Sequence, residues 1–326
     1  MTVREQYTLR HYLPDDYQTL AQLLKAANTV LGVASSITAD ELEAMIAVPD
    51  FNPGTDSFVF EDGGRVIAMS HQGFHTNSGV CWADAVVHPE YWGQGIGAEL
   101  IRVTEARCLE WAEQTLPPEQ TVLVQLAVSD RNARALRLFK AHGYQVVRTF
   151  YKMQIDFADP VEMTEPINTP LPAGLELRPF DWTRDARAVY EADMDAFADH
   201  WGFERETFEE WARGVIDNPQ TDFSLWLVAY DGNEIAGICL NRASDADNPD
   251  MAWVWLLGVR RNWRKQGLGT ALLRTSFARL RKRGSKGAGL MVDSSNPTNA
   301  VGLYERAGMY VERRRLVYHK VLRGAA

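Results

Sequence analysis

The feature of the sequence with the clearest chemical potential is a glycine-rich turn that occurs twice. Gly267 and Gly269 follow an apolar segment ending at Val259 and precede a segment with the apolar spacing of a helix. Gly95 and Gly97 stand in the same context in the first half, 172 residues earlier. Glycines at such a turn let backbone N–H groups converge on an anion, and the N-terminus of the following helix adds partial positive charge. The turn therefore predicts a pyrophosphate site, although its spacing matches neither the nucleotide P-loop nor the dinucleotide fingerprint.

The two turns belong to a unit that is repeated along the chain. One G-x-G alone is compatible with a simple tight strand-to-helix turn, but its recurrence in the same context favours binding. Each half also shows a strand pair, around 58–70 and 225–240, joined by a turn that contains Asp-Gly. Buried strands are expected over 121–128 and 289–293, after the helix that follows each glycine turn. These signals predict a mixed α/β fold in both halves.

The length and composition predict two domains joined by a linker. A chain of 326 residues is long enough to bury two separate cores. The segment 158–173 is rich in proline and shows neither helical nor strand periodicity, which is typical of a linker. We therefore expect a first domain at 1–157 and a second domain at 174–326.

Composition also excludes several classes of protein. Cys81, Cys108 and Cys239 have no C-x-x-C spacing and no adjacent histidine pair, so we expect buried thiols rather than disulfides or a metal site. The net charge of −9 disfavours nucleic acid as a partner. No apolar run approaches the roughly 20 residues of a membrane helix, and the first residues lack the plan of a signal peptide. We expect a soluble, cytoplasmic protein that has no membrane partner and needs no metal.

Taken together, the motifs resemble those of the GNAT N-acetyltransferase superfamily in both halves. The family signature is R/Q-x-x-G-x-G/A at the turn, followed by N-x-x-A and a Leu-Tyr pair ahead of the last strand. The second half carries Arg264, Gly267, Gly269, Asn299, Leu303, Tyr304 and Gly308. The first half carries Gly95, Gly97, Asn132, Ala135, Leu138 and Gly143. The resemblance implies an α/β (α+β) fold with two tandem GNAT domains, each a mixed, mostly antiparallel sheet flanked by helices.

The resemblance also implies acetyl-coenzyme A (acetyl-CoA) as co-substrate. Its pyrophosphate would lie at the glycine turn and its pantetheine arm along the fourth strand, which ends at Val87 or Val259. The implied cofactor-binding residues of the second half are Leu257, Val259, Arg264, Lys265, Gln266, Gly267, Leu268, Gly269, Thr270, Asn296 and Asn299. Those of the first half are Val87, Gly93, Gln94, Gly95, Ile96, Gly97 and Asn132.

The spacing leaves open which asparagine of the second half meets the cofactor. Asn296 lies eight residues before Tyr304 and Asn299 lies five before it. In the first half, Asn132 lies seven residues before Phe139. Neither second-half spacing equals that of the first half, so both asparagines stay candidates.

The two halves differ at the position of the expected catalytic acid. In the family the tyrosine that corresponds to Tyr304 commonly protonates the departing coenzyme A thiolate, and the alternative for Tyr304 is a packing role. Phe139 stands at this position in the first half and has no proton to give. Trp92 likewise stands where the second half has Arg264. The resemblance therefore implies an active second domain and a catalytically degenerate first domain, with a structural or cofactor-holding role.

The general base stays open at the level of sequence. A carboxylate on the fourth strand is a common family solution, but residues 252–259 contain none, whereas Asp84 lies on the corresponding strand of the first half. Candidates in the second half are Glu191, Asp193, Asp195, His200 and Asp293. Any one of these carboxylates is more often a solvated or capping group than a base, and relay through water is an alternative.

Charge and aromatic residues suggest where an acceptor would bind. Residues 174–250 hold 6 Lys and Arg against 18 Asp and Glu, whereas residues 251–326 hold 16 against 3. A basic side suits coenzyme A phosphates, and an acidic side suits an amine that arrives as a cation. An aromatic set could wall the acceptor pocket or simply form core: Trp201, Phe203, Phe208 and Trp211.

The resemblance thus implies direct attack of a primary amine, expected to be that of a small molecule, on acetyl-CoA in a ternary complex. The tandem organisation is also similar to that of the mycothiol synthases, which acetylate a cysteinyl amino sugar. The alternative is a non-catalytic sensor or scaffold that binds coenzyme A, because Phe139 and the missing strand carboxylate are unusual for an enzyme. The sequence does not define the oligomeric state.

Overall fold

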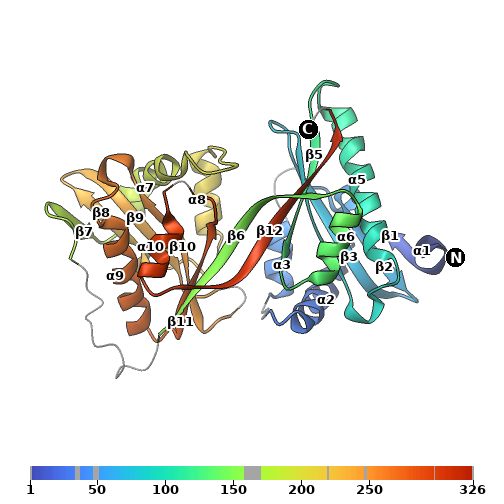
Figure 1. The fold of residues 1–326 in the computed structure, drawn as a ribbon, viewed down its shortest axis with the longest axis horizontal. Coiled ribbons are helices and arrows are strands. Elements are labelled where there is room, and N and C mark those ends of the chain that lie inside the picture. Colours follow the sequence, from blue (N-terminus) through green and yellow to red (C-terminus); the bar gives the residue numbers. More distant parts are fainter. Residues whose placement is uncertain are drawn as a thin grey trace. The chain divides into compact units, whose positions relative to one another are not determined.

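The chain folds into two compact units. The computed structural model describes residues 2–33, 37–46, 51–157, 170–218, 220–245, 248–296 and 298–324. The first unit comprises Met1–Thr149 and Arg314–Ala326, and the second comprises Phe150–Arg313 (Figure 1). Each unit is a mixed sheet flanked by helices, which confirms the predicted fold class. No helix of the described ranges has the length and apolar character required to cross a membrane.

The sheet of the first unit pairs its strands antiparallel except at β4 and β5, which are parallel. Its strands, in spatial order, are β1 (Thr8–Arg10), β2 (Ser57–Asp62), β3 (Arg65–His75), β4 (Val80–Val87), β5 (Val122–Ser129) and β12 (Tyr310–Arg323). Its helical segments are α1 (Val3–Gln6), η1 (Pro14–Asp16), α2 (Tyr17–Val30), α3 (Ala39–Ile46), α4 (Pro53–Asp56), η2 (Pro89–Tyr91), α5 (Ile96–Thr115) and α6 (Ala133–Ala141).

The sheet of the second unit repeats this plan, with β10 and β11 as its parallel pair. Its strands, in spatial order, are β7 (Leu175–Arg178), β8 (Leu227–Asp231), β9 (Glu234–Arg242), β10 (Met251–Val259), β11 (Gly287–Asp293) and β6 (Gln145–Asp156). Its helical segments are α7 (Trp182–Phe197), α8 (Phe208–Ile216), η3 (Phe223–Leu225), η4 (Arg261–Trp263), α9 (Leu268–Lys282) and α10 (Ala300–Arg306). The strand pairs and buried strands predicted from the sequence are all present.

Each unit is completed by the last strand of the other half of the sequence. β6 pairs with β11, from Phe150 opposite Asp293 to Asp156 opposite Gly287, and thus belongs to the second unit. β12 pairs with β5 from Arg315 to Arg323 and thus belongs to the first unit. The two strands hold equivalent places in a duplicated fold, so either can complete either sheet, and sequence signals do not distinguish the two arrangements.

The unit boundaries therefore differ from the sequence boundaries at 1–157 and 174–326. The compact units divide at Thr149 and Arg313, inside the two exchanged strands. Of the expected linker at 158–173, residues 158–169 lie outside the described part of the chain.

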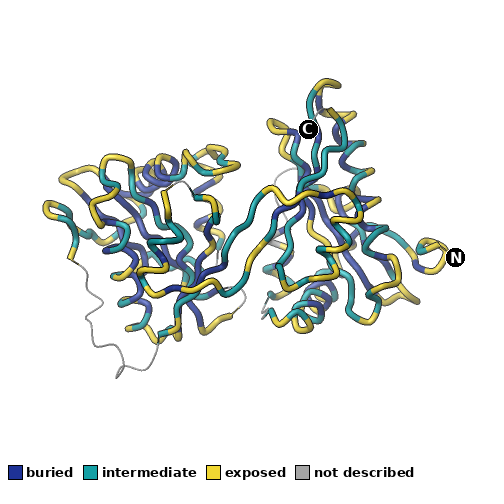
Figure 2. The backbone as a smooth tube through the Cα atoms, viewed as in Figure 1, coloured by how far each residue is buried: buried dark blue, intermediate teal, exposed yellow. Residues whose placement is uncertain are grey.

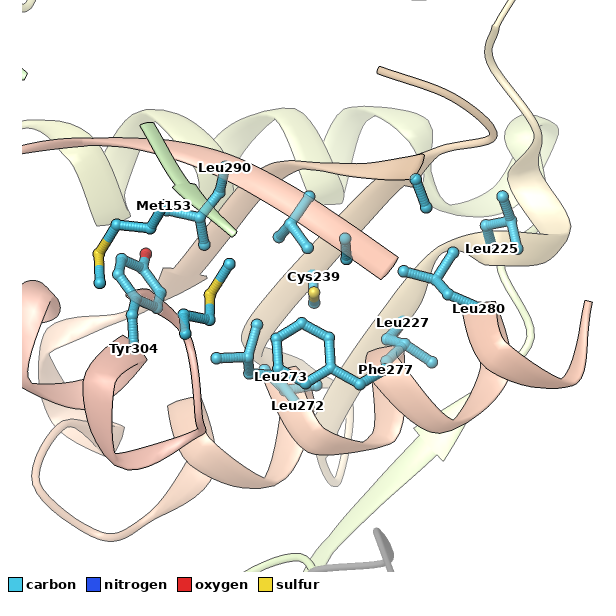
Figure 3. Packing of buried hydrophobic residues seen from close by; sticks show 14 of the residues in the cluster. Met153, Leu225, Leu227, Cys239, Leu272, Leu273, Phe277, Leu280, Leu290 and Tyr304 are labelled. Atoms are coloured by element: carbon cyan, nitrogen blue, oxygen red, sulfur yellow. The ribbon is translucent and has the colours of Figure 1, made fainter. Parts of the chain in front are cut away.

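The second unit has an apolar cluster on each face of its sheet. Ile238 and Leu240 of β9 point to the face covered by α7 and α8, in a cluster that includes Trp211. Cys239 points to the opposite face, where it packs with residues of α9 and α10 (Figure 3). This alternation follows from the two-residue period of a strand. The central strands of both units are accordingly buried (Figure 2), and all three cysteines are buried thiols, as predicted.

The strand exchange predicts that the two halves do not fold separately. A chain of residues 1–157 lacks the segment of β12 that covers the edge of β5, so we expect it to aggregate or to unfold without cooperativity. Co-expressed with residues 174–326, it should purify as a complex of one copy of each, measured by light scattering and thermal unfolding. A monomeric 1–157 chain with a cooperative transition would contradict this arrangement.

Candidate active site

The parallel strands of the second unit stop pairing before either strand ends. The ladder between β10 and β11 runs from Met251 opposite Gly287 to Trp253 opposite Gly289. β10 nevertheless continues to Val259 and β11 to Asp293. Beyond the ladder, the edge of β10 that faces β11 carries backbone groups that an extended ligand can pair with as an added strand would.

The parallel strands of the first unit also stop pairing before they end. β4 pairs with β5 from Val80 opposite Leu123 to Ala83 opposite Leu126, and β4 continues to Val87. Both units therefore have this early end of strand pairing, as expected for a duplicated fold. The units differ in one respect, because β10 has a bulge between Val254 and Leu256 whereas the ladder of β3 and β4 is regular.

The glycine turn has one backbone conformation in both units. Lys265 and Gly267 have φ angles of 62° and 86°, and Gly93 and Gly95 have φ angles of 85° and 86°. This left-handed conformation lets α9 begin at Leu268 directly after the turn, so its first N–H groups have no partner within the helix. A Cβ atom on Gly267 would meet nothing within 4 Å, so the position is open to a ligand.

The second glycine of each turn allows close packing instead. A Cβ atom on Gly269 would lie 3.1 Å from the Cδ1 atom of Leu303 on α10. On Gly97 it would lie 3.0 Å from the Cδ2 atom of Leu138 on α6. The two glycines of the motif thus have different roles, the first in the turn and the second in helix packing.

Two side-chain hydrogen bonds fix the turn in each unit. Gln266 Nε2 donates to the Asn262 carbonyl at 3.0 Å, and Gln94 Nε2 donates to the Glu90 carbonyl at 3.3 Å. Arg264 Nε donates to the carbonyl of Val259 at 3.0 Å. In the first unit the indole Nε1 of Trp92 makes the equivalent bond, 2.7 Å to the Val87 carbonyl. Trp92 therefore preserves the turn and removes the positive charge.

The surroundings of the turn distinguish the units. In the first unit, α1 lies against it: Val3 Cγ2 is 3.2 Å from where a Cβ atom on Gly95 would be, and the Tyr7 hydroxyl donates to the Gln94 side chain. Glu99, in the first turn of α5, pairs with Arg102 and Arg4, and these hydrogen bonds hold the pKa of Glu99 below its usual range. The ionised carboxylate opposes a second anion at this helix N-terminus.

In the second unit, no described residue packs against Gly267 as Val3 packs against Gly95, and the carboxylate near the turn, that of Asp199, is paired with Arg261 and Arg264. The first turn of α9 holds no acidic residue, and Ala271 stands where the first unit has Glu99. Lys265 adds a positive charge where the first unit has Gly93. A carboxylate with its own arginine partners therefore already stands in the first helical turn of the first unit, whereas the first turn of α9 has no acidic residue and is preceded by Arg264 and Lys265.

Tyr304 of α10 lies in the core cluster that contains Met153, Cys239 and Leu290 and is 8% exposed (Figure 3). Burial, and to a smaller degree the Cys239 thiol, raise its pKa well above the ordinary tyrosine value, so the hydroxyl keeps its proton at neutral pH. Among the residues that the structure describes, none forms a hydrogen bond with this hydroxyl. Tyr304 thus packs in the core and also presents an unused donor. Phe139, its counterpart, packs against Tyr318 with ring centroids 5.3 Å apart.

The asparagines after β5 and β11 are used differently. Asn132 caps α6 by accepting a 3.0 Å hydrogen bond from the Ala135 N–H. Asn299 precedes α10 with a φ angle of 55° and makes no side-chain cap. The Oδ1 atom of Asn296 accepts from the Thr298 N–H at 2.8 Å, and its Nδ2 atom lies 3.4 Å from His200 Nε2. The structure thus joins Asn296 to one of the candidate bases.

The structure separates the candidate bases by environment. Glu191 pairs with Arg205 and Asp195 pairs with Arg260, so both carboxylates are held in ion pairs. Asp193 is buried and accepts a 3.0 Å hydrogen bond from the Trp211 indole, and burial raises its pKa to about 7. His200 lies beside Asn296, and burial lowers its pKa below the usual histidine value.

The aromatic residues of 201–211 divide between core and surface. Trp211 is 2% exposed and belongs to the cluster under α7 and α8. Phe203 and Phe208 are partly buried against that cluster, and Trp201 is exposed. The core interpretation therefore holds for Trp211.

Comparison with known proteins identifies the family. The Acetyltransferase (GNAT) family matches residues 186–309, and an Acetyltransferase (GNAT) domain matches residues 53–146. A mycothiol acetyltransferase of Salinispora arenicola is 31% identical over 232 residues, which are 69% of this chain and 68% of that protein. One from Corynebacterium efficiens is 24% identical over 305 residues, 91% of this chain and 90% of that protein.

A solved structure agrees over the whole chain. A GCN5-related N-acetyltransferase from Sphaerobacter thermophilus has a TM-score of 0.81 and 28% identity, and the match covers 100% of this chain and 98% of that one. The chain therefore belongs to the GNAT acetyltransferase family and is an acetyltransferase with two GNAT domains. The resemblance seen in the sequence motifs is confirmed.

The matched bonds of Arg264 and Trp92 generate a paired prediction. Trp92→Phe removes only the bond to the Val87 carbonyl, so we expect about 1 kcal/mol less unfolding free energy and unchanged acetyl-CoA affinity. Arg264→Met removes the charge, the bonds to the Val259 and Ala196 carbonyls and the ion pair with Asp199, and acetyl-CoA affinity should fall about tenfold or more. Urea unfolding and calorimetry measure both effects. Unchanged acetyl-CoA affinity in Arg264→Met would refute the assigned role.

Proposed function

We propose that the second unit transfers the acetyl group of acetyl-CoA to a primary amine of a small molecule. The observation that carries this proposal is the combination, in one unit, of an unobstructed glycine turn and a protonated tyrosine hydroxyl without a partner. The family supplies the acetyl donor. The curated relatives are named mycothiol acetyltransferases, and this name supports a small-molecule acceptor.

In this proposal the pyrophosphate binds at the N-terminus of α9, next to Gly267, with Arg264 and Lys265 as cations beside it. The other proposed binding residues are Leu257, Val259, Gln266, Leu268, Gly269, Thr270, Asn296 and Asn299. Gln266 and Gly269 would contribute by shaping the turn, because Gln266 is hydrogen-bonded to Asn262 and Gly269 packs against Leu303.

The first unit has a structural role in this proposal. Val87, Gly93, Gln94, Gly95, Ile96, Gly97 and Asn132 build the same turn and helix ends as their counterparts. Because α1 and Glu99 occupy the turn, these residues support the fold of the first unit rather than a second cofactor.

The chemistry needs a proton donor for sulfur and a proton acceptor for the amine. The neutral amine forms a bond to the acetyl carbonyl carbon, the carbon–sulfur bond breaks, and Tyr304 donates its proton to the departing thiolate. The raised pKa of Tyr304 keeps its hydroxyl protonated at neutral pH, so the donor is present when the thiolate departs. In this proposal, backbone N–H groups of β10 beyond the ladder polarise the carbonyl.

His200 is the proposed proton acceptor. Asp293, the last residue of β11, interacts electrostatically with His200. Tyr304 interacts electrostatically with Cys239 of β9, which pairs with Leu257, a residue of β10 beyond the ladder with β11. Since burial lowers the pKa of His200, the imidazole is neutral and able to accept a proton at pH 7.

Replacing Tyr304 by Phe tests the proposed function directly. Loss of the hydroxyl should lower kcat by about 100-fold or more, with the KM for acetyl-CoA unchanged, measured by thiol release. Tyr310→Phe is the matched control, because its hydroxyl donates to Asp156 in the same unit at an exposed position. Full turnover by Tyr304→Phe, or an equal loss in the control, would refute the role of Tyr304.

The pH dependence of the reaction tests His200. A base must be neutral to act, so kcat/KM should fall with decreasing pH only in the acid range below the ordinary histidine pKa of 6.5. His200→Gln should lose this acid limb together with most of the rate. His319→Gln is the control, since His319 also has a pKa lowered by burial but belongs to the first unit. An unaltered acid limb in His200→Gln would exclude it as the base.

A further inference from the structure

The second unit holds a partly buried cation that has no counter-charge within the part of the chain that the structure describes. Arg242, the last residue of β9, is partly buried, and its Nε atom is buried with no hydrogen-bond partner. Among the described residues, no carboxylate forms an ion pair or hydrogen bond with its guanidinium. Asp245, three residues further along, is instead paired with Lys152 at 2.5 Å. Burial without a partner lowers the pKa of Arg242, which shows an unfavourable cost that a bound anion would remove.

The guanidinium lies against an aromatic ring. Its central carbon is 4.4 Å from the ring centroid of Trp255, in a cation–π contact. Trp255 in turn lies 6.5 Å, between ring centroids, from the buried Trp226. A guanidinium carries paired N–H donors along its edge, and these match the two oxygens of a carboxylate.

Arg242 and Trp255 lie where the strands begin to separate. Arg242 pairs with Trp253, the last residue of β10 in the ladder with β11. Trp255 is the residue at the bulge directly after it. Arg242 is two and four residues after Leu240 and Ile238, so it lies on the same face of the strand as they do, the face covered by α7 and α8.

This position is too far along the sheet to bind the phosphates of acetyl-CoA. The glycine turn follows Val259, six residues beyond Trp253, which is about 20 Å of extended strand. By contrast, Cys239, with which Tyr304 interacts electrostatically, is three residues before Arg242, about 10 Å along β9. An anion bound to Arg242 therefore belongs to the acceptor rather than to the acetyl donor.

We propose that the acceptor of this acetyltransferase carries a carboxylate, which Arg242 binds while the amine of the same molecule reaches the acetyl group. This inference rests on the proposed function and narrows its substrate class to amino acids and short peptides. Lys152 lies over the ring of Trp253 and is already paired with Asp245, so Arg242 contributes one positive charge of its own, which favours a carboxylate over a phosphate dianion. Arg242 selects and positions the acceptor and takes no part in the proton transfers.

Matched acceptors that differ only in the carboxylate test this inference. The probes are glycine, alanine, cysteine and their diglycyl extensions, each as the free acid and as the C-terminal amide, with aminoethyl phosphate as a further arm. The wild type should acetylate at least one acid with a kcat/KM at least tenfold above that of its amide. Amides equal to or better than the acids throughout, turnover of neither form, or preference for the phosphate would overturn the proposal.

Variants separate this inference from the proposed function. Arg242→Met, which keeps the apolar stem over Trp255, should raise the KM for the preferred acid about 10- to 100-fold and leave the KM for its amide and the affinity for acetyl-CoA unchanged. Arg242→Lys should restore part of the preference. Arg279→Met removes an exposed arginine of α9 and should change none of these. Failure of the wild type to bind acetyl-CoA would refute the proposed function instead, whereas equal losses for acid and amide in Arg242→Met would refute only the role of Arg242.

Discussion

The site depends on the separation of two parallel strands. β10 and β11 stop pairing at Trp253 and Gly289 while both continue towards the same edge of the sheet. A paired continuation would bury the backbone of β10 and leave no space for an acetyl donor. Because the strands separate, the glycine turn at the end of β10 faces an open approach. In the proposed reaction, Tyr304 and His200 act beyond the point where the two strands separate.

Duplication preserved this framework in both units but not its electrostatics. The turn keeps the same left-handed residues and the same two hydrogen bonds, even though Trp92 replaces Arg264. What changed in the first unit is the charge and accessibility at the helix N-terminus, where Glu99 and α1 take the place of an external anion. A conserved backbone geometry therefore does not by itself define a binding site.

The sequence predicted the fold class, the strands and the glycine turns because each depends on local patterns. It did not predict the exchange of β6 and β12, since the two strands hold equivalent places and either can pair with either sheet. Glu99 offered a readable signal, an acid in the first helical turn where the second half has Ala271. The contact between α1 and Gly95, by contrast, had no signal in the sequence that could have predicted it. The orphaned Arg242 also required the structure, because a missing counter-charge is a property of the fold and not of the neighbouring sequence.

The central claim is that one unit, the second, binds the acetyl donor at its glycine turn. Calorimetric titration with acetyl-CoA of the wild type, Gly267→Glu and Gly95→Glu tests it most directly, with circular dichroism to confirm that each variant is folded. A side chain at Gly267 meets no other atom within 4 Å, and a residue other than glycine strains the turn at a φ angle of 86°, so the carboxylate and the strained turn both oppose binding of the pyrophosphate. Gly95 has the same φ angle, so Gly95→Glu is the control with matched strain. We predict one site in the wild type, none in Gly267→Glu and one in Gly95→Glu. Two sites in the wild type, or binding retained in Gly267→Glu, would contradict the account.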